Sequence, residues 1–363
     1  MKKKITFILP SLCVGGAENN TVKLSNQMVD LGHDVYIITI FSPNQYKSEL
    51  DDRVKVINLN CKRLSSSVKK LRPILIRLSP DGIFTNMWPL TFFTFLSIIW
   101  NKSLRKRTIL VEHINIKVGL KNCTIFERYL EYTFHLLAPQ FVKGIIGVSP
   151  GVISSLRKNH KLSNRKYKVI PNPIFMKDSI SIQSIKNFKS YPKCLKILAV
   201  GNFKPQKDYL TMFLVLRRLE ELNIDSKLLI AGGGELLKEY KGIAFNLGLN
   251  EKIEFLGVVK NLKKLYISSD LYLMTSAWEG FGNTIAEALS YGCRVVSTDC
   301  PSGPSYILGN GKYGTLANVG DIESVADAII KEISIERTAN QFAEAVQDFS
   351  IETVTSSYLE IVD

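Results

Sequence analysis

The strongest constraint on the fold is a repeated alternation of short apolar runs with segments long enough to form a helix. Such runs are typical of strands buried on both faces of a parallel sheet, and helix-length connections between them indicate βα units. Helical spacing is clear at residues 20–31 and 209–222. The expected strands form two sets: residues 5–9, 35–40, 82–85, 107–111 and 144–148, and then residues 196–200, 226–231, 253–256, 271–274 and 294–297. The sequence therefore predicts an α/β protein with two Rossmann-like domains on parallel sheets.

A polar stretch rich in Ser, Lys and Asn separates the two sets of strands. We place the N-terminal domain at residues 1–172, a linker at 173–193 and the C-terminal domain at 194–345. Residues 346–363 carry a helical pattern and are expected to pack back on the N-terminal domain. Ligands bind beyond the carboxyl ends of strands in such sheets, so we expect the two sheets to face each other across a deep cleft that holds the site.

The cysteines and the hydropathy of the sequence indicate in which cellular compartment the protein is expected. The six cysteines are scattered without a C-x-x-C pair, which argues against a zinc site or a disulfide framework and fits a reducing compartment. No apolar run reaches the roughly 18 residues of a membrane-spanning helix. The first apolar run breaks at Pro10, which favours a buried strand over a signal peptide. These features predict a cytoplasmic protein.

Charge is distributed unevenly along the chain. Residues 1–190 carry 30 Lys and Arg against 11 Asp and Glu, whereas residues 191–363 carry 17 against 22. Such an imbalance indicates that the basic half meets a polyanion. Aromatic residues do not interleave with the basic ones and no nucleic-acid motif is present, so an anionic membrane surface is favoured over DNA or RNA.

The apolar stretch at residues 88–100 is the expected membrane contact. Basic side chains bracket it: Lys69, Lys70, Arg72 and Arg77 before it, and Lys102, Arg105, Lys106 and Arg107 after it. The stretch is too short to span a bilayer but suits a helix that lies in the membrane interface. A core helix with basic ends is the alternative, and the charge imbalance favours the membrane surface.

Two carboxylates eight positions apart, Glu279 and Glu287, are the most informative residues for function. A helix that begins near Asn283 places Glu287 on its second turn and leaves Glu279 on the preceding loop. Backbone N–H groups at the helix start suit a diphosphate, while the two carboxylates suit sugar and ribose hydroxyls. The segment between them, Gly280, Phe281, Gly282, Asn283 and Thr284, therefore predicts a nucleotide-sugar site. An ordinary junction of loop and helix with two solvated acids is the alternative.

Three glycine-containing loops follow expected strands. They contain Gly15 and Gly16 in the first, Gly201 and Asn202 with Lys204 and Lys207 in the second, and Gly233 and Gly234 in the third. Glycine allows close approach of a phosphate or sugar, and lysine neutralises a diphosphate leaving group. The first loop lacks the G-x-G-x-x-G pattern, which weakens a dehydrogenase interpretation. Each loop taken alone is equally typical of a packing turn.

His113 directly follows the fourth expected strand of the first set. That position places it at the carboxyl edge of the sheet, where a ligand is expected. We expect it to hydrogen-bond a transferring sugar, with a structural polar role as the alternative.

Taken together, these motifs resemble the retaining glycosyltransferases of family 4, which have the two-domain GT-B fold. The match runs through nearly the whole chain: Gly-Gly-Ala-Glu18, Glu-His113, Ile-Pro-Asn-Pro173, Gln-Lys207, Glu-Gly-Phe-Gly-Asn283, Glu287 and Ser-Thr-Asp-Cys-Pro-Ser-Gly-Pro304.

The resemblance implies a role for each matched residue. His113 and Glu279 would contact the donor sugar, and Glu287 the ribose. The backbone of residues 281–284 would contact the phosphates. Lys207 would bind the diphosphate, which Gly16 would approach from the other domain.

One position departs from the family pattern. The family usually has Arg where this chain has Asn202, so Lys207 must carry more of the leaving-group charge, with Lys204 as a further cation. The implied reaction is retaining transfer in which the leaving phosphate accepts the proton of the acceptor, and no metal or other cofactor is required.

The expected donor is a nucleotide sugar, UDP-hexose or UDP-N-acetylhexosamine. The expected acceptor is a lipid-diphosphate-linked glycan of a surface polysaccharide, reached at the inner face of the cell membrane. A sugar-nucleotide 2-epimerase of the same fold and a non-catalytic binding protein are the alternatives, and no nucleic-acid partner is expected.

Overall fold

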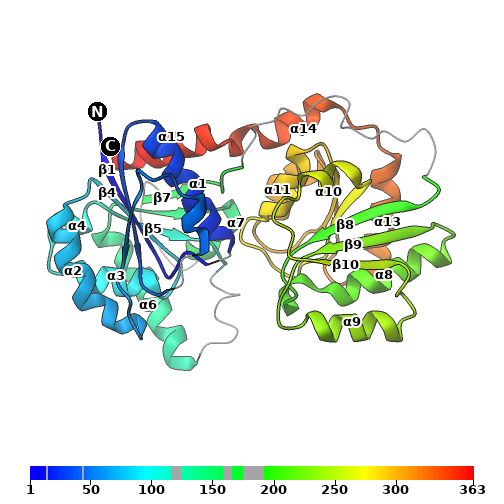
Figure 1. Ribbon diagram of the computed structural model, residues 1–363, viewed down its shortest axis with the longest axis horizontal. Helices are drawn as coiled ribbons and strands as arrows, with labels where there is room; N and C mark the ends of the chain where they lie inside the picture. The colour runs from blue at the N-terminus through cyan, green and yellow to red at the C-terminus, as the bar shows by residue number, and fades with distance from the viewer. Residues whose placement is uncertain (14, 43–44, 116–123, 158–165, 175–191) are drawn as a thin grey trace. The chain divides into compact units, whose positions relative to one another are not determined.

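The computed structural model describes residues 1–13, 15–42, 45–115, 124–157, 166–174 and 192–363. The chain divides into two compact units (Figure 1): unit 1 is Met1–Phe175 with Phe349–Asp363, and unit 2 is Met176–Asp348. Most of the expected linker at 173–193 lies outside the described residues.

Unit 1 is built on a seven-stranded sheet in the order β3-β2-β1-β4-β5-β6-β7. Every pairing in it is parallel. The strand order reverses at β1, which lies between β2 and β4, so the carboxyl ends of β1 and β4 form the switch point where ligands bind in such sheets. The strands are β1 Lys4–Leu9, β2 Asp34–Thr39, β3 Lys55–Asn58, β4 Gly82–Asn86, β5 Thr108–Glu112, β6 Gly144–Gly147 and β7 Tyr167–Val169.

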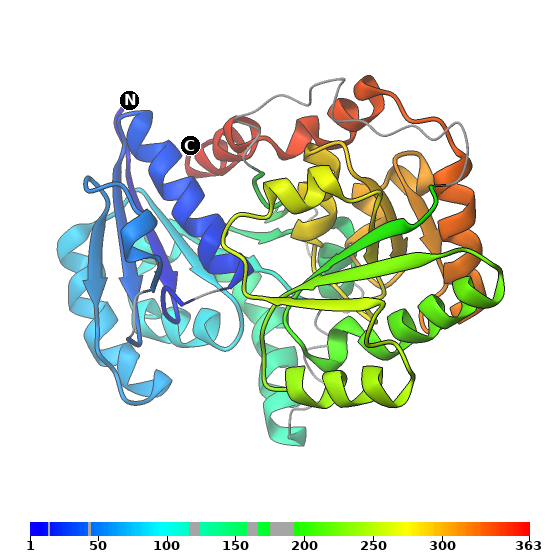
Figure 2. The same cartoon turned by 45° about the vertical axis from the view of Figure 1, so that its right-hand side comes forward.

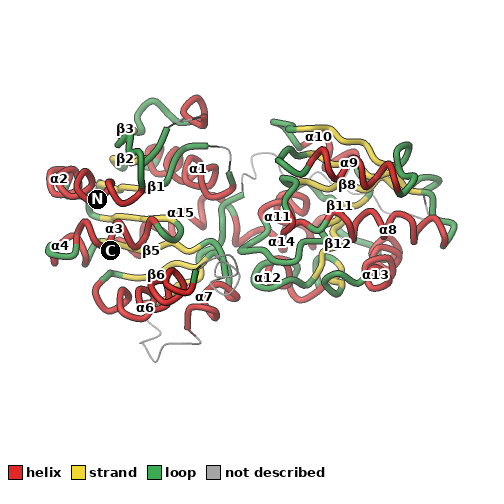
Figure 3. Tube along the Cα trace, turned by 90° about the horizontal axis from the view of Figure 1, so that it is seen from below, coloured by secondary structure: helices red, strands yellow, loops and turns green. Residues whose placement is uncertain are grey.

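Helices cover both faces of this sheet (Figure 3). Neighbouring residues of β1 point to opposite faces, so Phe7 packs under α1 and α15 while Ile8 packs against α2 and α3. The helices are α1 Gly16–Asp30, α2 Ser67–Leu78, α3 Leu90–Ile98, α4 Lys102–Arg105, α6 Ile125–Phe141, α7 Pro150–Arg157 and α15 Ile351–Val362, with short 3-10 turns η1 Gln45–Glu49 and η2 Leu64–Ser66.

The last helix, α15, belongs to the core of unit 1 although it comes from the end of the chain. It lies beside α1 (Figure 2). Tyr358 packs its ring 5.0 Å from that of Phe84, which in turn stacks 5.3 Å from Phe7. These buried aromatic contacts attach the C-terminus to the central strands.

Unit 2 is built on a six-stranded parallel sheet in the order β10-β9-β8-β11-β12-β13. The order reverses at β8, so the carboxyl ends of β8 and β11 form the second switch point. The strands are β8 Leu195–Val200, β9 Ser226–Ala231, β10 Ile253–Gly257, β11 Leu271–Met274, β12 Arg294–Thr298 and β13 Thr315–Ala317.

One face of this sheet is covered by α8 and α13, which share a hydrophobic core with it. On β11, Leu271 and Leu273 point into that core, whereas Tyr272 reaches α11 on the opposite face. The helices are α8 Tyr209–Glu221, α9 Leu237–Asn246, α10 Lys263–Ser268, α11 Asn283–Ser290, α12 Pro304–Ile307, α13 Ile322–Ser334 and α14 Ala339–Val346, with 3-10 turns η6 Pro205–Lys207 and η7 Gly309–Gly311. A last 3-10 turn, η8 Gln347–Phe349, leads from unit 2 into unit 1.

The apolar stretch at residues 88–100 is mostly a core helix. It forms α3, in which six residues are buried: Leu90, Thr91, Thr94, Phe95, Ser97 and Ile98. The core-helix alternative therefore describes most of the stretch, and only its outer side and Trp100 reach the surface. Among the described residues, no helix combines the length and hydropathy needed to cross a membrane.

Candidate functional site

A partly buried ion pair marks the switch point of unit 2. Lys207 Nζ lies 2.7 Å from Glu279 Oε1, and these two side chains are only 19% and 11% exposed. Ser276 donates a further hydrogen bond of 2.8 Å to the same carboxylate oxygen. The loops after β8 and β11 therefore hold a cation and a carboxylate together where a ligand is expected.

Hydrogen bonds fix the two loops to each other. The Gln206 carbonyl accepts a bond of 2.8 Å from the Ala277 N–H, and the Gln206 side chain donates one of 2.8 Å to the Trp278 carbonyl. Thr275 Oγ1 donates to the carbonyl of Lys207 at 3.0 Å. Sequence reasoning named Lys207 but missed these supporting side chains, although Thr275 directly follows an expected strand.

Helix α11 begins at Asn283, as the sequence predicts. Gly282 precedes it with φ of 104°, a left-handed conformation that favours glycine. Gly303 packs so closely on the Phe281 carbonyl that a Cβ there would overlap it. Thr284 accepts a 2.5 Å hydrogen bond from Tyr272. These contacts thus fix the position of the helix start. The positive end of the helix dipole lies there, at the switch-point end of the sheet.

Glu287 lies on the second turn of α11, and a buried tyrosine orients it. The Tyr266 hydroxyl donates to Glu287 Oε2 at 3.3 Å. The Tyr266 ring stacks on Tyr291 with centroids 5.7 Å apart. Burial and then the nearby carboxylate raise the pKa of Tyr266 well above its ordinary value, so its hydroxyl remains a donor. Sequence reasoning missed Tyr266, which lies in a helix with no recognisable motif.

The glycine loops of unit 2 lie near the ion pair of Lys207 and Glu279. A Cβ on Gly201 would come within 2.9 Å of Lys207 Cε, so glycine leaves room for the lysine side chain. The Gly233 carbonyl accepts from the Phe203 N–H at 2.7 Å, which joins the loop of Gly233 and Gly234 to that of Gly201. Asn202 and Lys204 lie at the exposed surface of the same loop.

In unit 1, His113 lies at the carboxyl edge of the sheet beside Asn86. His113 Nε2 is 3.0 Å from Asn86 Oδ1. Because Asn86 is the last residue of β4, the pair spans the ends of two neighbouring strands. Burial lowers the pKa of His113 to about 4, so the imidazole is neutral at pH 7. Sequence reasoning missed Asn86 as a candidate site residue, although it directly follows the expected strand 82–85.

The glycine loop of unit 1 contains a carboxylate. Gly16 is the exposed first residue of α1, and the Glu18 carboxylate folds back against Gly15. Burial raises the pKa of Glu18. The Glu18 carboxyl thus lies near the start of α1, where the helix dipole favours negative charge.

Glu112, which precedes His113 in the chain, forms a buried acidic pair with Glu131. Glu112 and Glu131 are both almost inaccessible to solvent, and His135 Nε2 is 3.8 Å from Glu112 Oε1. Burial, and then repulsion by Glu131, raises the pKa of Glu112 to about 8, and burial raises that of Glu131 to about 7. This part of unit 1 therefore retains carboxyl protons near neutral pH.

No group of three or more His, Cys, Asp or Glu side chains in the described part of the chain is arranged to hold a metal ion.

Comparison with known families matches both halves of the chain. Residues 14–176 match the model of Glycosyltransferase Family 4, and residues 182–349 match that of Glycosyl transferases group 1.

Two curated relatives come from Campylobacter jejuni. The first is N-acetylgalactosamine-N,N'-diacetylbacillosaminyl-diphospho-undecaprenol 4-alpha-N-acetylgalactosaminyltransferase, 25% identical over 339 residues, which cover 89% of this chain and 88% of that protein. The second is GalNAc-alpha-(1->4)-GalNAc-alpha-(1->3)-diNAcBac-PP-undecaprenol alpha-1,4-N-acetyl-D-galactosaminyltransferase. It is 25% identical over 381 residues, covering 99% of this chain and 98% of that one.

A solved structure supports the fold. Alr3699/HepE of Anabaena, crystallised in complex with UDP-glucose, superimposes with a TM-score of 0.78 at 21% identity, covering 99% of this chain and 98% of that chain. The matched families, the two parallel sheets and this likeness agree with one another. The chain belongs to the group 1/family 4 glycosyltransferases and is a glycosyltransferase with the GT-B fold.

Proposed function

We propose that this enzyme transfers a hexose or N-acetylhexosamine, with retention, from a UDP-linked donor to a lipid-diphosphate-linked glycan in surface-polysaccharide synthesis. The observation that carries the proposal is the Lys207–Glu279 pair at the switch point of unit 2, next to the start of α11. The two Campylobacter jejuni relatives support the acceptor, because the name of each contains a diphosphate- or PP-undecaprenol-linked glycan. The UDP-glucose complex of the Anabaena protein supports the donor.

The ion pair has a direct role in this proposal. Without donor, Glu279 compensates the charge of Lys207 at 2.7 Å. A bound diphosphate offers Lys207 a stronger anionic partner, and the carboxylate of Glu279 then accepts hydrogen bonds from sugar hydroxyls. Donor binding therefore exchanges one internal contact for two contacts with the ligand.

The remaining donor contacts follow from the placement of α11. The backbone of residues 281–284 receives the phosphates at the helix start, and Glu287, oriented by Tyr266, accepts hydrogen bonds from the ribose hydroxyls. Asn202 supplies no charge, so Lys207 carries the leaving-group charge, with the exposed Lys204 as a weaker, solvent-screened contribution.

The transfer step needs no protein base. The bond between the anomeric carbon and the diphosphate oxygen breaks, and its electron pair leaves with the diphosphate, which Lys207 stabilises. The acceptor hydroxyl attacks the same face of the sugar, and its proton passes to the departing phosphate oxygen. His113, neutral at pH 7 because its pKa is about 4, serves as a hydrogen-bonding partner of the sugar. A lipid-linked acceptor implies that the protein works peripherally at the inner face of the cell membrane.

Thermal shift against a panel of nucleoside diphosphates and their sugars tests the donor site. We expect stabilisation by UDP and by UDP-sugars, and its loss in Glu287→Ala. Glu239→Ala removes an exposed acid from α9 and should leave the shift unchanged. Equal shifts in both variants, or preference for another nucleotide, would contradict the proposed donor.

A further inference from the structure

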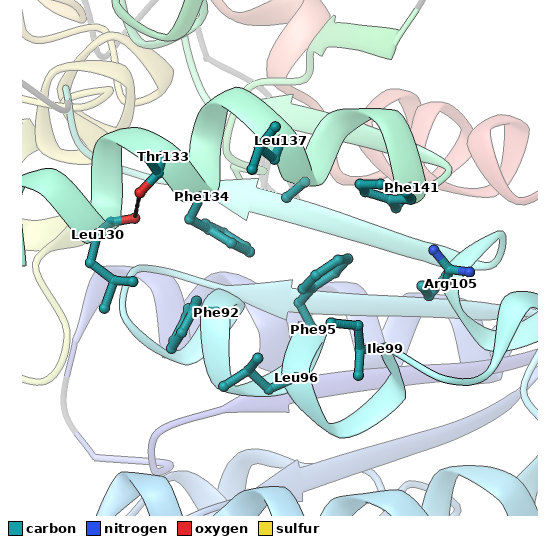
Figure 4. Close-up of a pocket in the computed structure, with 11 residues that line it drawn as sticks. Phe92, Phe95, Leu96, Ile99, Arg105, Leu130, Thr133, Phe134, Leu137 and Phe141 are labelled. Atoms are coloured by element: carbon teal, nitrogen blue, oxygen red, sulfur yellow. Dashed lines mark hydrogen bonds between the residues drawn. The ribbon is translucent and has the colours of Figure 1, made fainter.

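Unit 1 carries an apolar groove of about 320 Å³ between α3 and α6. Figure 4 shows side chains of both helices pointing into it. Phe92, Leu96 and Ile99 come from α3 and the residue after it, at the spacing of one helix face. Leu130, Leu137 and Phe141 form the matching strip of α6. Apolar helix faces ordinarily pack against other parts of a protein, but these two faces line an open groove.

The groove has a solid floor and an exposed rim. The Phe95 and Phe134 rings meet edge to face at 5.8 Å and are nearly inaccessible to solvent. On the rim, Leu137 is 51% exposed and Phe141 is 45% exposed. A rim of this kind loses unfavourable contact with water once an apolar ligand covers it.

Exposed apolar residues continue beyond the groove along both helices. Phe126 and Tyr129, in the first turns of α6, are 73% and 67% exposed, and Trp100, just after α3, is 83% exposed. Aromatic residues of this kind are enriched where proteins meet the polar boundary of a bilayer. The groove is therefore part of a larger apolar surface.

A cationic edge adjoins the groove. Among the described residues that line it, Arg105 is the only charged one. The guanidinium of Arg105 lies 5.3 Å from the centre of the Phe141 ring, and its Nε is buried without a hydrogen-bond partner among the described residues. Lys102 and Lys106, on either side of it, are exposed. Apolar lining with cations at one end is complementary to an anionic lipid, whose hydrocarbon needs no hydrogen bonds and whose phosphate needs positive charge.

We propose that this surface docks unit 1 on an anionic membrane, with one lipid hydrocarbon chain in the groove and lipid phosphates beside Arg105, Lys102 and Lys106. The inference deepens the proposed function and rests on it in one respect, since a lipid-linked acceptor is presented at a membrane. It keeps the outer side of α3 and the cations that follow it, which the sequence indicated, and adds the groove and the exposed side of α6, which the sequence did not indicate.

Flotation with vesicles of phosphatidylcholine, with and without phosphatidylglycerol, tests this. The protein should float with the anionic vesicles. Its tryptophan fluorescence, to which the exposed Trp100 contributes, should shift to the blue. Leu137→Asp should lower the vesicle partition coefficient by about tenfold or more, because it removes a leucine side chain that the membrane would bury. Arg105→Gln should lower it by about fivefold, the usual contribution of one cation near an anionic surface.

Matched controls change the same chemistry elsewhere. Phe245→Asp on α9 and Arg217→Gln on α8 alter exposed residues of unit 2 and should leave flotation unchanged. Leu137→Asp and Arg105→Gln should keep the wild-type thermal shift with UDP, which shows that they are folded. Equal loss of flotation in all four variants, or none in the groove variants, would overturn the proposal.

Two further outcomes separate this inference from its premise. Stabilisation by UDP without binding to anionic vesicles would overturn membrane docking and leave the donor assignment standing. Stabilisation by farnesyl diphosphate, lost in Leu137→Asp and without vesicle binding, would also overturn it and assign the groove to the acceptor lipid. Vesicle binding that depends on Leu137, without any nucleotide effect, would support docking and contradict the proposed donor.

Discussion

At the scale of single residues, the site depends on side chains that hold other side chains. Ser276 and Lys207 fix the Glu279 carboxylate, and Tyr266 fixes that of Glu287. Sequence spacing identified both carboxylates, because E-x7-E with intervening glycines is a local pattern. It did not identify Ser276 or Tyr266, because their roles arise only when separate segments are brought together by the sheet.

Tyr266→Phe should raise the KM for the UDP-sugar by about three- to tenfold, as expected for the loss of one hydrogen bond to a carboxylate. The kcat should change much less, because ribose contacts are made equally in the ground and transition states. Steady-state kinetics checks this, with Tyr36→Phe on β2 as the control. An unchanged KM would show that Tyr266 does not position Glu287.

At the scale of elements, a buried charge network joins β12, β13 and α13. Glu332 is fully buried, with Arg337 Nη2 at 2.6 Å and Arg294 Nη1 at 3.9 Å, and it accepts a bond from Thr315 at 2.7 Å. The network attaches the edge of the sheet to the helix that covers it.

Glu332→Ala should lower the free energy of unfolding of unit 2 by about 3–5 kcal/mol, because it leaves buried arginines without their anion. Urea unfolding followed by circular dichroism measures this. Glu336→Ala, an exposed acid shortly after the same helix, should cost less than about 0.5 kcal/mol. A similar small cost for both variants would mean that the network does not stabilise the fold.

The elements themselves were largely predictable. All ten expected strands are present, because strands buried on both faces read as continuous apolar runs. The strands β3, β7 and β13 were not predicted: β3 is a half-exposed edge strand, and the other two have only three residues each. Helix α1 was expected from residue 20 but begins at Gly16, because the glycines concealed its first turn.

At the scale of the whole molecule, the stability of unit 1 depends on pH through one buried pair of carboxyl groups. In unit 1, the pKa of Glu112 and of Glu131 is raised from 4.5 to about 8 and about 7. The folded state therefore binds protons that the unfolded state releases above pH 4.5. Unfolding free energy from this pair falls as pH rises from about 4.5 to about 8, and it levels off above that.

Glu131→Gln should raise the melting temperature at pH 8 by several degrees, at about 2–4 °C for each kcal/mol, and change it little at pH 5. Glutamine mimics the protonated acid, so the variant gains only where the wild-type carboxyl is ionised. Glu352→Gln on the exposed side of α15 is the control, and scanning calorimetry at the two pH values is the measurement. An equal gain at both pH values would contradict the titration.

The charge asymmetry and the family motifs were visible in the sequence at this scale, whereas the groove was not. Its two walls come from helices separated by the strand β5, and only folding places Phe92 and Leu137 on the same opening.

In the proposed reaction, Lys207 stabilises the leaving diphosphate. The most direct measurement is the kcat for sugar transfer, monitored as the release of UDP, in the variants Lys207→Ala and Lys204→Ala. We expect Lys207→Ala to lower kcat by about 10²- to 10³-fold, as for loss of one group that stabilises developing charge, while Lys204→Ala stays within a few-fold of wild type. If Lys207→Ala keeps kcat near the wild-type value, the Lys207–Glu279 pair is not the reacting end of the donor site.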